Sequence, residues 1–520
     1  MNFDKQYSKK KLLSIALFII LIQSPFQITS QILVKADIDL ENGDNHNSST
    51  KYFEGYNLYI LERQNISSYN ILDRKIMITD MENNVYLEKS LSNISVLADI
   101  EFYNASTLIY GDSGNIKMWN IYTGITTELG FGSHHDIEIN YVNNSILALG
   151  LYQIDIDENT YVYDLINEYS LNGTLMRTFY TSDFVKPWQI CPFVNLGIGP
   201  IEVTHVNSIS FDEDEMAIYV NCRNQNTFYK IDSKTGKLIW GLGEYGNFTM
   251  YDINGKEKDY LFFHSHSLKK IADNKFLLFD NDFHNKTDAI DKKSRYLEIT
   301  IDEEQMVARV TKEWISPEEY FSPIWGDCDL LPNNNFFGAF SYTTNYGQET
   351  GSKLVEVNDK GEIVWLLESP IDEGIKYTIY KVERVRVAPF VSPPSLFEIR
   401  ENTYFAWDVR YNFNANTRFE GKYFILLDDQ LMELGNISFK KYWQSNQVQY
   451  NLGDIDPGEH EISLIVQDEV GHLSNETKFY DGTAVFNVHE KILIGVGISL
   501  GLGLLILSII LLAKRNLAKV

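Results

Sequence analysis

Cysteine is scarce in this sequence, with three among 520 residues. Three thiols allow at most one intramolecular disulfide, which excludes the small, disulfide-rich secreted scaffolds. Among Cys191, Cys222 and Cys328 we expect a bridge between Cys191 and Cys222, with one thiol left over.

Positive charge is also sparse. Lys and Arg number 45 against 71 Asp and Glu, for a formal net charge of −26. Such a field repels phosphate groups, so nucleic acid is excluded as a partner. Apolar residues make up 44% of the chain and aromatic residues 13%, which is ample material for buried cores. A length of 520 residues indicates several domains or a large β-fold.

Long apolar runs are confined to the two ends of the sequence. Lys9, Lys10 and Lys11 precede an apolar run from Leu12 to Ile22, and small polar residues follow it. This run is too short to span a bilayer and is typical of a signal peptide, predicted over residues 1–30.

Residues 492–513 form the second run, which carries no charge and is followed at once by Lys514 and Arg515. A run of this length predicts a transmembrane helix, and the basic residues place the tail 514–520 in the cytoplasm. We therefore expect a single-pass type I membrane protein whose ectodomain lies at the cell surface. Gly497 and Gly501 have the spacing of a helix-packing motif, so a homodimer is possible.

Sites for N-linked glycosylation occur between the two ends and suit an extracellular glycoprotein. The asparagines are Asn47, Asn65, Asn93, Asn104, Asn143, Asn172, Asn247, Asn285, Asn436 and Asn475.

Turn residues flanked by alternating apolar residues recur along the chain, which is the pattern of β-hairpins. Six hairpins are predicted, at residues 75–89, 114–129, 162–179, 227–243, 295–314 and 352–368. A second pair of short strands precedes at least five of them, as at residues 99–111, 136–151 and 267–279. Four short strands per repeat are typical of a β-propeller. An array of β-sandwiches and a pair of unrelated β-domains are the alternatives.

The sequence thus predicts an all-β protein with a six-bladed β-propeller at residues 56–382, after a polar lead-in at 31–55. Prolines 389, 393 and 394 mark a linker. The alternating strands beyond it predict an immunoglobulin-like or fibronectin-like β-sandwich at residues 387–489.

Three histidines occupy the same position in three successive repeats. His135, His205 and His266 each stand at the start of the first strand of their repeat. First strands line the channel of a propeller, so these side chains are expected to converge at one end of it. A structural role for each histidine is the simplest alternative, and three imidazoles also suit a metal such as zinc.

Arg223, at the end of a second strand, favours an anion over a cation at this place, because a guanidinium repels a metal and binds oxyanions. Asn207 would add a neutral donor beside His205. The set is typical of a site for an anionic group in transfer.

Several segments together resemble the arylsulfotransferase family, the PAPS-independent aryl sulfate sulfotransferases. They cover about 280 residues and are HHDIEI at 134–139, HVNSI at 205–209, NCR at 221–223, HSLKKIADNKFLLFDN at 266–281, SRYLEI at 294–299 and DLLPNNN at 329–335. The resemblance also implies a six-bladed propeller. Ser265 stands where the family usually has glutamine.

The resemblance implies that His266 is the nucleophile that becomes transiently sulfated, with His135, His205 and Arg223 around the sulfuryl group and Asn207 assisting. His264 and His134 are neighbouring alternatives to His266 and His135. A ping-pong transfer of this kind needs no nucleotide cofactor and no metal. Its partners would be an aryl sulfate donor and a phenolic acceptor, with His135 or His205 as the general base.

Two other functions stay open on the residues alone. In one, the histidines bind an anion on a surface adhesion protein without chemistry. In the other, His135, His205 and His266 ligate a metal in a hydrolase or oxidase.

Overall fold

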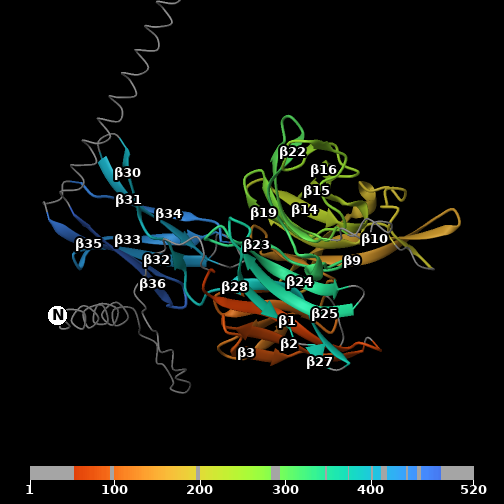
Figure 1. The fold of residues 1–520 in the computed structure, drawn as a ribbon, viewed down its shortest axis with the longest axis horizontal. Coiled ribbons are helices and arrows are strands. Elements are labelled where there is room, and N and C mark those ends of the chain that lie inside the picture. Colours follow the sequence, from red (N-terminus) through yellow and green to blue (C-terminus); the bar gives the residue numbers. More distant parts are fainter. Residues whose placement is uncertain are drawn as a thin grey trace, which may run out of the picture. The chain divides into compact units, whose positions relative to one another are not determined.

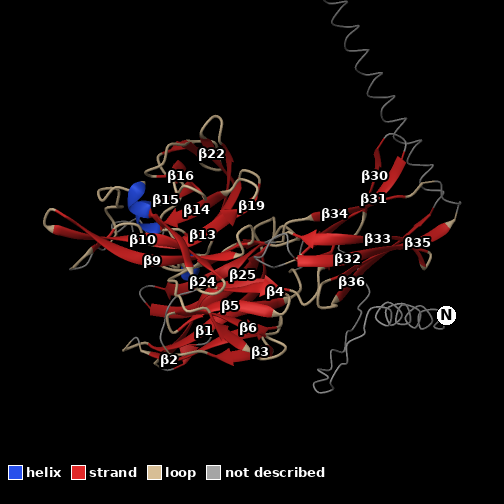
Figure 2. Ribbon diagram, turned by 180° about the vertical axis from the view of Figure 1, so that it is seen from behind, coloured by secondary structure: helices blue, strands red, loops and turns tan. Residues whose placement is uncertain are grey.

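The computed structural model of the chain describes residues 52–481, apart from 69, 94–98, 195–198, 283–292, 346–347, 370, 373, 400–401, 412–418, 441–442 and 454–457. Strands dominate, and the helical segments of this part are three short 3-10 turns (Figure 2). They are η1 (Thr181–Asp183), η2 (Arg223–Gln225) and η3 (Glu318–Tyr320). The described part of the chain is all-β, as predicted for these residues.

Six of the sheets follow one another in sequence, and we number them sheets 1 to 6. Sheet 1 contains β1 (Tyr56–Asn65), β2 (Ile71–Thr79), β3 (Val85–Ser90), β27 (Ile371–Asp372) and β28 (Ile375–Val385). Sheet 2 contains β4 (Ile100–Asn104), β5 (Thr107–Asp112), β6 (Asn115–Asn120) and β7 (Thr126–Glu128). Sheet 3 contains β8 (Ile137–Asn140), β9 (Ser145–Ile156), β10 (Asn159–Ser170), β11 (Leu175–Tyr180) and β12 (Ile201–Glu202).

The next three sheets are likewise mainly antiparallel; the short strands β12 of sheet 3 and β17 of sheet 5 pair in parallel. Sheet 4 contains β13 (Val206–Asp212), β14 (Ala217–Cys222), β15 (Thr227–Asp232) and β16 (Leu238–Gly243). Sheet 5 contains β17 (Thr249–Tyr251), β18 (Glu257–Lys258), β19 (His266–Ala272), β20 (Lys275–Asp280), β21 (Arg295–Asp302) and β22 (Val307–Ile315). Sheet 6 contains β23 (Asp329–Leu330), β24 (Phe336–Asn345), β25 (Gln348–Val357) and β26 (Ile363–Glu368).

Each of the six predicted hairpins coincides with an antiparallel pair of these strands, from β2–β3 to β25–β26. The turns form where the sequence supplies glycine at positive φ, as at Gly173 with φ +82° and Gly361 with φ +79°. Local turn chemistry and period-two alternation therefore set the strand pairs.

Sheet 1 is completed by a strand from far along the chain. β28 pairs with β1 over a register that runs from Asn65 opposite Ile375 to Tyr56 opposite Val385. The two strands lie side by side in Figure 1. The end of the repeat region thus closes on its beginning, which is the strand order of a closed propeller.

Contacts between first strands link all six sheets into a ring. The Lys381 ammonium of β28 lies 2.7 Å from Asp99 Oδ2, just before β4, and 2.6 Å from Asp136 Oδ1, just before β8. Asp136 Oδ2 accepts a bond from the amide of Ile209 in β13. The amide of Leu268 in β19 donates to Ser208 Oγ in β13.

The ring then closes through one aspartate. Asp327, just before β23, accepts a hydrogen bond from Ser267 Oγ of β19 and another from the amide of Val382 in β28, at 3.0 Å. Sheet 5 is thereby joined to sheet 6, and sheet 6 to sheet 1. The first strands of the six sheets therefore surround a common centre.

Residues beyond 389 form two further sheets. One contains β29 (Phe390–Val391), β30 (Ser395–Ile399), β31 (Asn402–Arg410) and β34 (Asn446–Asn451), and the other contains β32 (Phe419–Leu427), β33 (Gln430–Phe439), β35 (Glu459–Gln467) and β36 (Leu473–Asp481). Trp407 of one sheet and Leu464 of the other are fully buried members of one core. An immunoglobulin-like strand order for this region stays a prediction.

Three predicted features lie wholly or mostly outside the part of the chain that the structure describes. The signal peptide at 1–30, most of the lead-in at 31–55 and the spanning helix at 492–513 lie outside the described residues. Within the described residues, no helix has the length and apolar character to cross a bilayer.

The expected bridge between Cys191 and Cys222 is wrong. Both thiols are free and buried, as is that of Cys328. Cys222 packs with Val206 and Tyr229 in the apolar core between sheets 3 and 4, so its thiol is a core side chain there.

Candidate active site

The three histidines singled out by the sequence lie at equivalent places in sheets 3, 4 and 5. His135 stands two residues before β8, His205 stands directly before β13, and His266 is the first residue of β19. The rings of His135 and His205 have centroids 4.9 Å apart. The Tyr380 ring of β28 lies 6.1 Å from His135 and 6.2 Å from His266. The structure thus gathers all three imidazoles around one place at the ring's centre.

Backbone conformation sets two of these histidines apart. His135 has φ +61° and His205 has φ +48°, in the left-handed region that residues with a side chain rarely adopt. Each such residue costs about 1–3 kcal/mol and persists only where its surroundings impose it. Strain of this kind gathers at sites that must hold a side chain in a fixed direction.

Arg223 faces the same cluster. Its amide donates to the carbonyl of His205 at 3.2 Å, where η2 begins. Burial holds the pKa of His266 well below its usual value, and the positive charge of Arg223 lowers it further. Both effects favour the neutral form of the His266 ring.

His134 connects its neighbour to a buried carboxylate. His134 Nε2 lies 3.1 Å from Asp164 Oδ1 and 3.3 Å from the carbonyl of Gly150, and both of these are acceptors. The Nε2 atom must then carry a proton. His134 Nδ1 lies 2.8 Å from His135 Nδ1, which makes a chain of Asp164, His134 and His135.

The members of this chain differ in charge preference. Burial disfavours protonation of His134, but the hydrogen bond and attraction to Asp164 outweigh it and raise its pKa. Burial and then the positive potential of His205 hold the pKa of His135 well below its usual value. Asp164 is itself fixed by the hydroxyl of Thr204 and the amide of Val206.

His205 has a carboxylate of its own. Its Nδ1 lies 2.9 Å from Glu202 Oε2, and the Glu202 side chain is 44% exposed. The pair directs the Nε2 atom of His205 away from Glu202.

His266 is backed by an amide instead. Its Nδ1 lies 2.6 Å from Asn281 Oδ1, directly after β20. Asn281 is fully buried and also bonds to two loop carbonyls of sheet 6.

The two remaining sequence candidates lie beside His266. Asn207 donates through Nδ2 to the carbonyl of Ser265 at 2.8 Å and accepts from Asn221 through Oδ1 at 2.7 Å. It therefore supports the backbone next to His266. His264 is buried, and its amide donates to Asn226 Oδ1 at 2.8 Å.

Three residues of the cluster were not foreseen. Tyr380 is buried, its hydroxyl has no hydrogen-bond partner among the described residues, and burial raises its pKa. Asp164 and Asn281 back the histidines from other strands. Asn281 ends one of the motifs that carry the family resemblance, but only the closed ring shows what it and the others contact.

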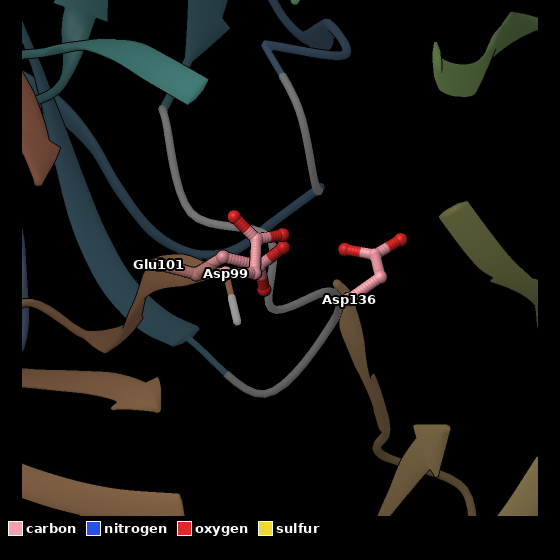
Figure 3. A group of neighbouring side chains, drawn as sticks. All are labelled: Asp99, Glu101 and Asp136. Carbon is pink, nitrogen blue, oxygen red and sulfur yellow. The ribbon is translucent and has the colours of Figure 1, made fainter. Parts of the chain in front are cut away.

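Acidic side chains, all but one of them buried, gather in two groups. Asp99, Glu101 and Asp136 form one group, shown in Figure 3, and Asp327, Asp329 and Glu383 form another. In each group the ligand atoms lie within 4.8 Å of one another, as a metal would need. Lys381 forms ion pairs with two members of the first group, and Lys269 forms an ion pair with the second. In both groups a lysine ammonium therefore offsets the negative charge of the carboxylates.

The comparisons with known proteins agree with the sequence motifs. The model of the family described as Arylsulfotransferase (ASST) matches residues 37–380, which include every residue of the cluster. No curated protein matches the chain.

Solved structures resemble the chain only weakly. A protein of unknown function from Bacteroides caccae is 14% identical, with a TM-score of 0.34, over 62% of this chain and 99% of its own. The periplasmic gluconolactonase of Pseudomonas aeruginosa is 9% identical, with a TM-score of 0.34, over 75% of this chain and 99% of its own. Likenesses this weak carry no argument about this protein.

Proposed function

This chain belongs to the arylsulfotransferase family, and we propose that it transfers a sulfuryl group from an aryl sulfate ester to a phenolic acceptor through a sulfohistidine at His266. The observation that carries the proposal is the convergence of the His135, His205 and His266 rings at the centre of the ring of sheets, with Arg223 bonded to the backbone of His205. A neutral ring nitrogen can attack sulfur, and a guanidinium can bind the oxygens that surround it.

In the donor half-reaction, His266 Nε2 attacks the sulfur as the bond from sulfur to the aryl oxygen breaks. The electron pair of that bond leaves with the aryl oxide. Arg223 meets the charge on the sulfuryl oxygens. We assign to the Tyr380 hydroxyl, unpaired within the described structure, a hydrogen bond to the departing oxygen or to a sulfuryl oxygen; the proximity of its ring to that of His266 supports this.

In the acceptor half-reaction, a phenol attacks the same sulfur and its proton passes to a base. His135 is the base we propose, since with His134 neutral the Nδ1 proton of His135 points to His134 and Nε2 is left with a lone pair. The charge that arises is stabilised along the chain to Asp164. His205, backed by Glu202, is the alternative base.

A turnover assay tests the proposal. The full-length protein, incubated with para-nitrophenyl sulfate and a phenol, is expected to release para-nitrophenol at a rate that depends on the phenol. His266→Ala should lower that rate by about a thousandfold or more. His460→Ala, a histidine of β35 paired with Asp428, is the matched control and should keep it.

Other outcomes point elsewhere. A wild-type protein without any turnover would favour anion binding on a surface protein. Activity that is lost with a chelator and restored by zinc would favour a metal enzyme.

We also propose that the enzyme faces the cell exterior, held by a spanning helix at residues 492–513. The eight described asparagines of the glycosylation sites support this, because none of them is buried. Protease treatment of intact cells should then remove the ectodomain and leave the tail 514–520 protected.

A further inference from the structure

The amide of Asn281 has one possible orientation. Its Nδ2 lies 2.7 Å from the carbonyl oxygen of Ser322 and 2.7 Å from that of Trp325. Both partners can only accept, so the NH2 group must face them. Turning the amide over would set its oxygen against two carbonyl oxygens. The Oδ1 atom therefore faces His266, with no freedom to exchange places with the nitrogen.

This orientation decides where His266 carries its proton. Oδ1 can only accept a hydrogen bond, and it lies 2.6 Å from His266 Nδ1. The Nδ1 atom must be the donor, so in the neutral ring Nε2 holds the lone pair. We propose that Asn281 is the positioning residue that fixes His266 in the tautomer whose Nε2 attacks sulfur. The inference rests on the function proposed above.

The amide also suits the second half of the reaction. When the bond between Nε2 and sulfur forms, Nδ1 keeps its proton, because an amide oxygen accepts a hydrogen bond but does not take the proton. The sulfonated ring then carries a positive charge. When the phenol oxygen bonds to sulfur and its proton goes to the base, the Nε2–S electrons return to the ring. Neutral His266 leaves with its Nδ1 proton in place.

The loop that accepts from Asn281 is rigidly placed. Trp325 has φ +62° and its ring lies edge-on to Tyr380 at 5.9 Å. Gly326 has φ +119°, and a Cβ there would come within 2.4 Å of Phe279. The Trp325 carbonyl thus belongs to a turn that favours glycine at its second position, and Ser322 is held separately by Ser294, whose Oγ accepts from the Ser322 amide at 2.9 Å.

The first test reads the tautomer without any turnover. In full-length protein labelled with ¹⁵N in the histidine rings, the signals of His266 are identified by their loss in His266→Ala. We expect a protonated Nδ1 and an unprotonated Nε2. Asn281→Ala should abolish this single tautomer, whereas Ser294→Ala should keep it. Ser294 Oγ bonds to the same Ser322 carbonyl at 3.2 Å and to the backbone carbonyl of Asn281 at 3.4 Å, but not to the Asn281 amide group, so it controls for disturbance of the surrounding loop.

The second test uses an isosteric change. Asn281→Asp keeps an acceptor behind Nδ1, so the tautomer should persist, but the carboxylate favours the protonated ring and raises the pKa of His266. In the pH–rate profile of the donor half-reaction, the acid limb, where the rate falls as His266 becomes protonated, should therefore move to higher pH. Asn281→Ala should slow that half-reaction by about 10- to 100-fold.

The outcomes separate this inference from the proposed function. An active wild-type enzyme whose His266 carries its proton on Nε2 would overturn the inference and leave the function intact. So would an acid limb that stays in place in Asn281→Asp. A wild-type protein with the expected tautomer and no turnover would overturn the function alone.

Discussion

The two sides of the imidazole cluster differ in what stands behind each ring. Behind His266 there is a neutral amide, Asn281, at 2.6 Å. Behind His134 and His205 there are carboxylates, Asp164 at 3.1 Å and Glu202 at 2.9 Å. A carboxylate stabilises a protonated ring, and a neutral amide does so far less. The side backed by carboxylates is therefore suited to holding a proton, and the side backed by the amide to attacking and leaving.

The charges around the rings follow the same division. Burial and then Arg223 keep the pKa of His266 low, whereas Asp164 raises that of His134 against the effect of burial. Within one cluster, nearby charged groups thus shift the pKa values of two histidines in opposite directions. Such a pattern distinguishes acid–base groups from a nucleophile.

The largest effect on rate is expected when Arg223, the cation near His266, is replaced. Arg223→Gln should slow the donor half-reaction by about 10²- to 10³-fold, because the sulfuryl oxygens lose a charged donor. It should also raise the pKa of His266 and move the acid limb of that half-reaction to higher pH. Single-turnover release of para-nitrophenol across a pH series measures both. Arg309→Gln, an exposed cation of β22, should change neither; an unmoved acid limb in Arg223→Gln would contradict the assignment.

A smaller effect is expected on the other side. Asp164→Asn should slow the acceptor half-reaction by about 100-fold, the lower range for general-base catalysis. Without the carboxylate the pKa of His134 falls, so the acid limb should move to lower pH, opposite to Arg223→Gln. Stopped-flow reaction of the preformed sulfo-enzyme with phenol measures this.

Glu168→Gln is the control for that change. Glu168 is equally buried in the same strand, β10, and is bonded to Arg177 and Ser145 away from the cluster. If both substitutions slow the reaction alike, Asp164 acts by stabilising the fold. The proposed role of the hydrogen-bonded series Asp164, His134 and His135 would then be wrong.

The smallest effect is expected at Glu202. Its side chain is 44% exposed, so water replaces much of what it supplies to His205. Glu202→Gln should slow the acceptor half-reaction by about tenfold or less. A loss larger than that of Asp164→Asn would make His205 the base in place of His135.

Much of this fold follows from local sequence. The hairpins were predictable because their strands alternate and five of the six turns have glycine or asparagine at positive φ, as at Gly124 and Gly236; the turn between β21 and β22 has Met306 there. The common position of His135, His205 and His266 in successive repeats was visible for the same reason.

Contacts made by the closed ring were not predictable. β28 pairs with β1 across some three hundred residues, and no local pattern marks that pairing. Tyr380 joins the cluster only through this closure. The partners of His266 and His134, Asn281 and Asp164, likewise follow from how sheets meet and not from spacing along the chain. The unbridged state of Cys191 and Cys222 depends in the same way on which core each thiol enters.

The most direct measurement is to find which residue carries the transferred group. Full-length protein treated with para-nitrophenyl sulfate in the absence of phenol, digested under alkaline conditions and mapped by mass spectrometry, should show one added sulfuryl group on His266. Addition of phenol before digestion should remove it. An enzyme that turns over while the label lies on another residue, or while no label forms at all, would contradict a sulfohistidine at His266.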